Sequence, residues 1–170
     1  MVMNMNRVLY EISSIYEFFT YIPFLFLTAL FLFLRYKYNG NKNFNDNKSY
    51  KGFIRGFVYL AILSMLCLLN QIDMYNKIVK AYEQGNYQIV EGYVENFDPM
   101  PYGGRKYESF DINGVSFSYS NFSTQMGYRN AKSHGGVITG NGQHLKIGYV
   151  YYNPAWDSGS NAIVYIEELD

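Results

Sequence analysis

The sequence predicts a membrane-anchored α+β protein, in which two N-terminal transmembrane helices precede a small, mostly antiparallel β-barrel domain. The chain has 170 residues, of which 49% are apolar and only 16% are charged. The apolar residues gather into two uncharged runs, 18–34 and 56–72. Beyond residue 85 apolar residues alternate with polar ones, which is typical of strands with one buried face.

Each apolar run has the length and composition of a membrane-spanning helix. At about 1.5 Å per residue a run is about 26 Å long, and flanking apolar residues extend it toward the roughly 30 Å hydrocarbon core. We expect helices at about 16–34 and 54–72, forming a transmembrane hairpin over residues 1–72. The alternatives are a cleaved signal peptide for the first run and a buried core helix for the second.

Basic residues gather between the two runs. Residues 35–55 contain six lysines and arginines against one acid, whereas the tails on the other side contribute three. Because cationic loops stay in the cytoplasm, we expect the C-terminal domain on the non-cytoplasmic side. Ser64, Cys67 and Asn70, spaced three apart, form a weakly polar stripe through which the helices would contact a neighbour in a homo-oligomer.

Residues 73–85 predict a helical stalk, and residues 86–170 predict the β-barrel-like domain. Met74, Ile78 and Tyr82 lie on one helical face of the stalk, and Gly85 is placed to cap its C-terminus. Strands are expected over Gln88–Phe97, with a bulge or close strand crossing at Gly92, over Leu145–Tyr152 and Ala162–Leu169, and briefly over Val137–Thr139. Five or six strands this short favour a barrel of the OB or SH3-like kind.

The segment 108–120 predicts a β-hairpin. Asn113-Gly114 is the dipeptide preferred in a two-residue type I′ turn, and Val115, Phe117 and Tyr119 alternate with serines. A two-residue loop pairs Ile112 with Val115, Phe110 with Phe117, and Glu108 with Tyr119.

Two longer loops, 98–106 and 121–136, are candidates for a binding surface. They hold four of the seven basic residues in 73–170, a segment that also has eleven acidic ones. Cations beside aromatic rings on an acidic domain would recognise an anion, such as a small ligand or a protein partner. Ordinary solvated loops are the alternative. The candidate ligand-binding residues are Arg105, Lys106, Tyr128, Arg129, Lys132 and His134.

Catalytic and metal-binding patterns are lacking. The lone Cys67 cannot form an intramolecular disulfide or a thiolate metal cluster, and the two histidines belong to no metal-ligand motif. No nucleophile elbow or phosphate-binding loop occurs, and the net charge of zero argues against binding to duplex nucleic acid. We therefore expect no enzymatic activity, no metal and no cofactor. An enzyme with an unrecognised site, using His134 and Asp111, is the alternative.

Two resemblances bear on function. The pieces VEGxVxNFxP and ExFxxxGVxFxYS, within residues 90–120, resemble a recurring domain of uncharacterised small bacterial membrane proteins. That resemblance implies a bacterial β-domain, and it brings no activity or functional residues. We expect the protein to lie in the bacterial inner membrane. In architecture alone, the layout looks like that of two-helix β-barrel effectors of antiphage systems, whose cytosolic barrel binds a cyclic nucleotide that controls membrane damage.

The expected function is therefore a non-enzymatic, membrane-tethered binding or sensing module, whose β-domain loops contact a ligand or protein partner. The alternative is an antiphage-defence effector in which the barrel senses a cyclic nucleotide and gates membrane disruption by oligomerised helices. In that case the loop cations would hold phosphates, and Tyr128 or Phe122 would stack on a base.

Overall fold

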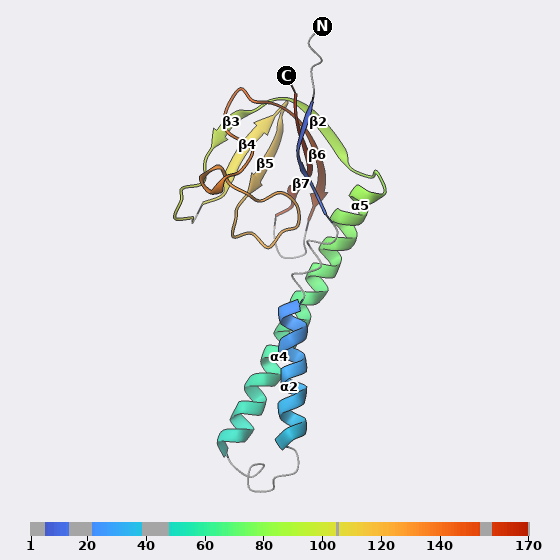
Figure 1. Cartoon of the computed structure of the whole chain (residues 1–170), viewed down its shortest axis with the longest axis vertical. Helices are drawn as coiled ribbons and strands as arrows, with labels where there is room; N and C mark the ends of the chain where they lie inside the picture. Colours follow the sequence, from blue (N-terminus) through green and yellow to red (C-terminus); the bar gives the residue numbers. More distant parts are fainter. Residues whose placement is uncertain (1–5, 14–21, 39–47, 105, 154–157, 170) are drawn as a thin grey trace. The chain divides into compact units, whose positions relative to one another are not determined.

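The computed structural model describes residues 6–13, 22–38, 48–104, 106–153 and 158–169. The chain divides into two compact units: a β unit of Met1–Ser13 and Met74–Asp170, and a helical unit of Ser14–Asp73. The N-terminal tail therefore belongs to the same unit as the C-terminal strands (Figure 1). Arg105, a candidate ligand-binding residue, lies outside the described residues.

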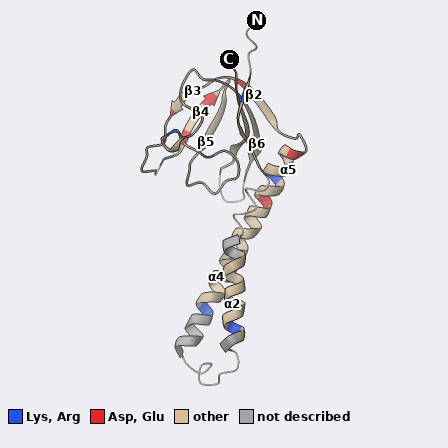
Figure 2. Ribbon diagram, viewed as in Figure 1, with Lys and Arg blue, Asp and Glu red and all other residues tan. Residues whose placement is uncertain are grey.

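The helical unit contains α2 (Ile22–Tyr38) and α4 (Lys48–Met74). The rings of Phe31 and Phe57 stack between the two helices with their centroids 5.0 Å apart. Between Arg55 and Asp73 the sequence of α4 has no charged residue (Figure 2). Many of the large apolar side chains described on both helices are exposed.

The predicted fold class is wrong about the membrane helices. Among the described residues one helix, Arg55–Glu83, is long and apolar enough to cross a membrane, and the apolar part of α2, Leu25–Tyr36, is too short. With 17 residues α2 would extend about 26 Å, less than the roughly 30 Å hydrocarbon core. The part of the chain that is described thus has no pair of N-terminal transmembrane helices. Arg55–Glu83 is a candidate by length and composition alone.

The β unit contains two antiparallel sheets (Figure 1). The first sheet has the strand order β1-β7-β6-β2, formed by β1 (Arg7–Glu11), β7 (Ser160–Glu168), β6 (His144–Tyr152) and β2 (Gln88–Tyr93). The second has the order β3-β4-β5, formed by β3 (Glu95–Asp98), β4 (Glu108–Ile112) and β5 (Val115–Tyr119).

The predicted barrel of the OB or SH3-like kind is also wrong, because the described strands form two separate sheets and no closed barrel. The chain passes from the first sheet to the second at Val94, which lies between β2 and β3. Two residues later, within β3, Asn96 has a φ of 50°. On the other side, β5 and β7 approach each other without a strand pairing. The side chain of Asn161 donates to the carbonyl of Ser116 over 3.0 Å, in place of a backbone ladder. The two sheets therefore stay separate.

Strand β1 was not expected from the sequence, because it precedes the first apolar run. It pairs with β7, placing Arg7 opposite Glu168 and Glu11 opposite Tyr165. The Tyr82 hydroxyl donates to the Glu11 carboxylate over 2.6 Å. This bond connects Glu11, near the residue where the chain leaves the β unit, to Tyr82, a few residues after the chain returns to it.

The predicted stalk is helical, but it packs against the first sheet. Helix α4 continues through a π-helix, η2 (Tyr75–Val79), into α5 (Lys80–Glu83). Met74, Ile78 and Val79 are buried, and η2 contacts β6 and β7. The expected cap is confirmed: Gly85 has a φ of 73° and its amide donates to the Tyr82 carbonyl over 3.0 Å.

The predicted hairpin is confirmed in its register. Strands β4 and β5 pair Ile112 with Val115, Phe110 with Phe117, and Glu108 with Tyr119. Asn113 and Gly114 have φ angles of 47° and 79°, as a type I′ turn requires. The alternation of β4 buries Glu108, Phe110 and Ile112 on one face, so a carboxylate shares the core with two large apolar side chains.

The remaining strand predictions are only partly correct. Gly92 is a close crossing as expected, because a Cβ there would lie 2.8 Å from Nδ2 of Asn113. The break in the strand is at Val94 instead. Val137–Thr139 forms no strand, although Ile138 is fully buried. Its backbone is held by side chains: the Tyr128 hydroxyl accepts from the Val137 amide over 2.6 Å.

Candidate functional site

A buried carboxylate lies where the two candidate loops meet. Glu108, at the start of β4, has no exposed surface. Its Oε1 accepts from the Tyr119 hydroxyl over 2.6 Å. The Lys132 amide donates to both carboxylate oxygens over 3.0 and 3.1 Å, and the Met100 amide donates to Oε2 over 3.3 Å. Glu108 therefore holds both loops, one through Met100 and the other through Lys132.

Further contacts join the same two loops. The buried Ser120 hydroxyl donates to the Met100 sulfur over 3.4 Å. The Phe122 ring lies so close to Gly104 that a Cβ there would be 2.5 Å from the ring edge. The Tyr102 and His134 rings stack, with centroids 4.9 Å apart and planes 3° apart. The loops thus form one packed structure with exposed ring edges and faces.

We call the exposed part of this structure the loop face. Its aromatic members are conspicuous, because Tyr102 is 77% exposed and Phe122 is 70% exposed. Exposed aromatic rings that lie close together are typical of surfaces that meet a partner. The loop face consists of Tyr102, Lys106, Phe122, Lys132 and His134.

The two lysines of the loop face lie over different parts of it. Lys106 forms an ion pair with Asp98 at 2.5 Å, and about half of each side chain is exposed. The Lys132 ammonium lies 5.6 Å from the centroid of the Phe97 ring, a cation–π contact. An exposed ion pair contributes little to stability, so separating Lys106 from Asp98 costs little free energy.

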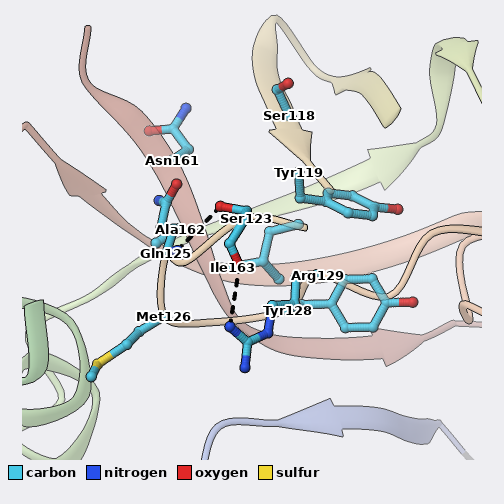
Figure 3. A pocket seen from close by; sticks show the side chains of 10 residues that line it. All are labelled: Ser118, Tyr119, Ser123, Gln125, Met126, Tyr128, Arg129, Asn161, Ala162 and Ile163. Atoms are coloured by element: carbon cyan, nitrogen blue, oxygen red, sulfur yellow. Dashed lines mark hydrogen bonds between the residues drawn. The ribbon is translucent and has the colours of Figure 1, made fainter. Parts of the chain in front are cut away.

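Arg129 lies apart from the loop face. Its guanidinium donates to the Ser123 carbonyl over 3.3 Å within its own loop, and it lines a pocket with Ser118 and Asn161 (Figure 3). The pocket has a volume of about 10 Å³, room for about one water molecule. A nucleotide or an organic cofactor needs a pocket of roughly 300 Å³ or more.

Tyr128 is buried and holds its loop in place. Its ring makes edge-on contacts with Tyr10 and Tyr119, at 5.1 and 5.2 Å between centroids. Its amide donates to the Ile163 carbonyl over 2.8 Å, which attaches the loop to β7. With 5% of its surface exposed, the ring is not accessible for stacking on a ligand.

The burial of Tyr128 makes a pH-dependent prediction. Burial raises the pKa of Tyr128 from 10.0 to about 12. A raised folded-state pKa contributes stability that is fully present below pH 10 and is lost as pH rises through 12. Tyr128→Phe removes the ionisable group, so we expect its stability to fall less steeply between pH 10 and 12 in urea denaturation of the full chain.

Tyr102→Phe is the control for this prediction, because Tyr102 is exposed. It should keep the alkaline stability loss of the original protein. A Tyr128→Phe protein that loses stability as steeply as the original would contradict the assigned role of the buried hydroxyl.

Metal-binding geometry is lacking among the described residues, which contain no group of three or more histidine, cysteine or acidic side chains that could hold an ion. His134 lies beside the Ser133 hydroxyl, with Nδ1 at 3.0 Å from Oγ. His144 stacks on Tyr93 at 4.5 Å, on the first sheet. Hydrogen bonds from Asn96 and Ser116 hold the pKa of Asp111 below its usual value.

Sequence analysis does not assign two residues of this region, Glu108 and Tyr102, to the site. Glu108 was assigned only a place in the hairpin, although its alternation with Phe110 and Ile112 was a signal that the carboxylate faces the core. Tyr102 was not singled out, and its stacking partner His134 lies 32 residues away in the sequence. Phe122 belongs to the predicted binding loop and was expected to stack on a base. Such contacts between distant residues leave no local pattern.

Comparison with known proteins does not assign the site. No family model, no curated protein and no solved structure matches this chain. The resemblance to small bacterial membrane proteins thus stays a prediction.

Proposed function

We propose that the chain is a non-enzymatic, membrane-attached binding module, and that the loop face is its binding surface. The observation that carries the proposal is the clamp at Glu108, which fixes two loops together while Tyr102 and Phe122 remain exposed. A fixed surface loses little conformational freedom on binding, and it therefore binds more tightly than two independent loops.

Membrane attachment is supported by the apolar helix. Leu60, Leu63 and Leu66 of α4 are each at least 58% exposed, and similar side chains cover the rest of the helix. Contiguous apolar surface of this extent is costly in water and favourable in lipid. The proposed location is the bacterial inner membrane.

The shape of the site favours a broad contact over an enclosed ligand. The pocket beside Arg129 has room for about one water molecule, whereas the loop face presents its rings outward. Lys106 and Lys132 lie on the same surface as the rings. This combination suits a partner with both apolar and anionic groups.

Site-specific photo-crosslinking in living cells tests this proposal. A photoreactive phenylalanine analogue replaces Phe122, and in a second protein it replaces Tyr93, which is 60% exposed on β2. We expect a crosslinked product at position 122 in the membrane fraction and none at position 93. Glu108→Gln should reduce the product at position 122, because the loops lose their common acceptor.

Equal amounts of crosslinked product at both positions would show that crosslinking follows exposure alone, which would contradict a specific binding surface at the loop face. No product at position 122 in intact cells would overturn the loop face as a binding surface.

A further inference from the structure

A small pocket lies between the two sheets, where β5 and β7 approach each other without a strand pairing. Ser118 of β5 and Ile163 of β7 line the pocket from the two sheets, and the later candidate loop contributes Ser123, Gln125 and Arg129 (Figure 3). Its volume of about 10 Å³ has room for about one water molecule or one ion of similar size. The pocket thus lies at the junction of both sheets and this loop.

The side-chain oxygens that the loop contributes to the pocket already accept hydrogen bonds. Oγ of Ser123 accepts from the Gln125 amide over 3.1 Å. The side-chain oxygen of Gln125 accepts from the Ser160 hydroxyl over 3.0 Å, and the Tyr128 hydroxyl accepts from the Val137 amide over 2.6 Å. A bound water molecule must donate hydrogen bonds as well as accept them, and these oxygens are already engaged. The loop therefore suits an occupant that only accepts.

Donors and a positive charge remain at the pocket. The Arg129 guanidinium has several N–H donors, and within the described part of the chain it bonds the Ser123 carbonyl and forms no ion pair. The described lining contains no aspartate or glutamate. The carboxylate of Glu108 does not line the pocket, and it already accepts from the Tyr119 hydroxyl and from two loop amides. The charge of Arg129 is therefore not neutralised within this lining.

We propose that this pocket binds chloride, a small anion that accepts hydrogen bonds and donates none. The Arg129 guanidinium supplies the positive charge, and the Ser123 hydroxyl and the side-chain nitrogen of Gln125 supply further donors. Attraction between unlike charges is stronger where protein partly replaces water. The volume admits a single-atom anion and is too small for a polyatomic anion such as phosphate. The site goes beyond the proposed function, because none of these groups belongs to the loop face.

Chlorine-35 NMR of the full chain in lipid nanodiscs tests this inference. Exchange of chloride between the bulk solution and a protein site broadens the bulk resonance in proportion to the bound fraction. We expect the protein to broaden the resonance beyond the width seen with empty nanodiscs. Bromide should remove most of this excess, because it is also a single-atom halide. Gluconate at the same ionic strength should leave the excess in place, because it is too large for the pocket.

Arg129→Gln should abolish the excess broadening, because it removes the positive charge of the lining. Arg7→Gln is the matched control, since Arg7 is exposed on β1 and does not line the pocket, and it should keep the excess. Gln125→Met keeps the charge and removes one donor, so an intermediate line width is expected. Near-ultraviolet circular dichroism checks that each variant is folded.

A folded Arg129→Gln protein that broadens the resonance as much as the original protein would overturn the chloride site. Should Arg129→Gln fail to fold, unchanged broadening by Gln125→Met would overturn it instead. A line width equal to that of empty nanodiscs would show that the pocket holds water at most. Gluconate that narrows the resonance as effectively as bromide would also overturn the site, because the chloride would then belong to a diffuse layer of counterions.

Discussion

Glu108→Ala should destabilise the β unit more than any other single change at the loop face. The substitution leaves the buried Tyr119 hydroxyl and Met100 amide, and the partly buried Lys132 amide, without their acceptor. Removing one partner from a buried charged network typically costs about 3–5 kcal/mol. Urea denaturation of the full chain in nanodiscs, followed by near-ultraviolet circular dichroism, measures the loss.

The exposed Glu91 of β2 supplies the matched control. Glu91→Ala should change stability by less than about 0.5 kcal/mol, because surface carboxylates contribute little. Glu108→Gln keeps the side-chain size, and its amide nitrogen cannot accept from the surrounding donors. It should therefore be destabilised to an intermediate degree. A Glu108→Ala protein as stable as Glu91→Ala would contradict the clamp.

Phe110→Ala should lower the free energy of unfolding by a similar amount, for a different reason. Phe110 is 1% exposed, its ring stacks on Phe117 at 5.1 Å, and it meets Tyr119 edge-on at 6.2 Å. Deleting a buried phenyl ring costs about 3–5 kcal/mol, through lost apolar burial and the cavity that remains. The same denaturation assay checks it.

Phe122→Ala is the control for Phe110→Ala, because it removes the same ring from a position that is 70% exposed. It should leave stability within about 0.5 kcal/mol and abolish the contact of the loop face with its partner. If Phe122→Ala were the more destabilising of the two, the ring would belong to the core and not to a binding surface.

The elements that the sequence predicted correctly are those determined by a few neighbouring residues. The Asn113-Gly114 turn predicted the β4–β5 register residue by residue, because a two-residue loop leaves one way to pair the flanking strands. Gly85 predicted the end of the helix for a similar reason. Two of the later strands, β6 and β7, begin within two residues of their expected positions.

The global arrangement depends on contacts that no local pattern carries. Arg7–Glu11 forms a strand only because β7 offers an unpaired edge about 155 residues later in the chain. The break at Val94 separates two sheets where a continuous strand was expected to close a barrel. The apolar runs alone also overestimated the number of membrane-spanning helices, since α2 as described is too short to cross a membrane.

For the candidate site, residue types predicted which loops form the surface more accurately than they predicted the role of each residue. The two loops named from their cations and aromatic rings do meet, and Lys106, Lys132 and His134 lie on their exposed face. Tyr128 supports that face from inside, and Arg129 bonds within its own loop. Burial of Glu108 decides these roles, and burial depends on which strands pack together.

Amide hydrogen exchange at Met100 and Lys132 tests most directly whether the two loops act as one surface. Both amides donate to Glu108, so in the original protein both should exchange slowly and at similar rates. In Glu108→Gln both should accelerate together, while the Val94 amide, which bonds the Gln143 carbonyl, keeps its rate. Rapid exchange at either amide in the original protein, or acceleration at only one of them in the variant, would contradict a single clamped surface.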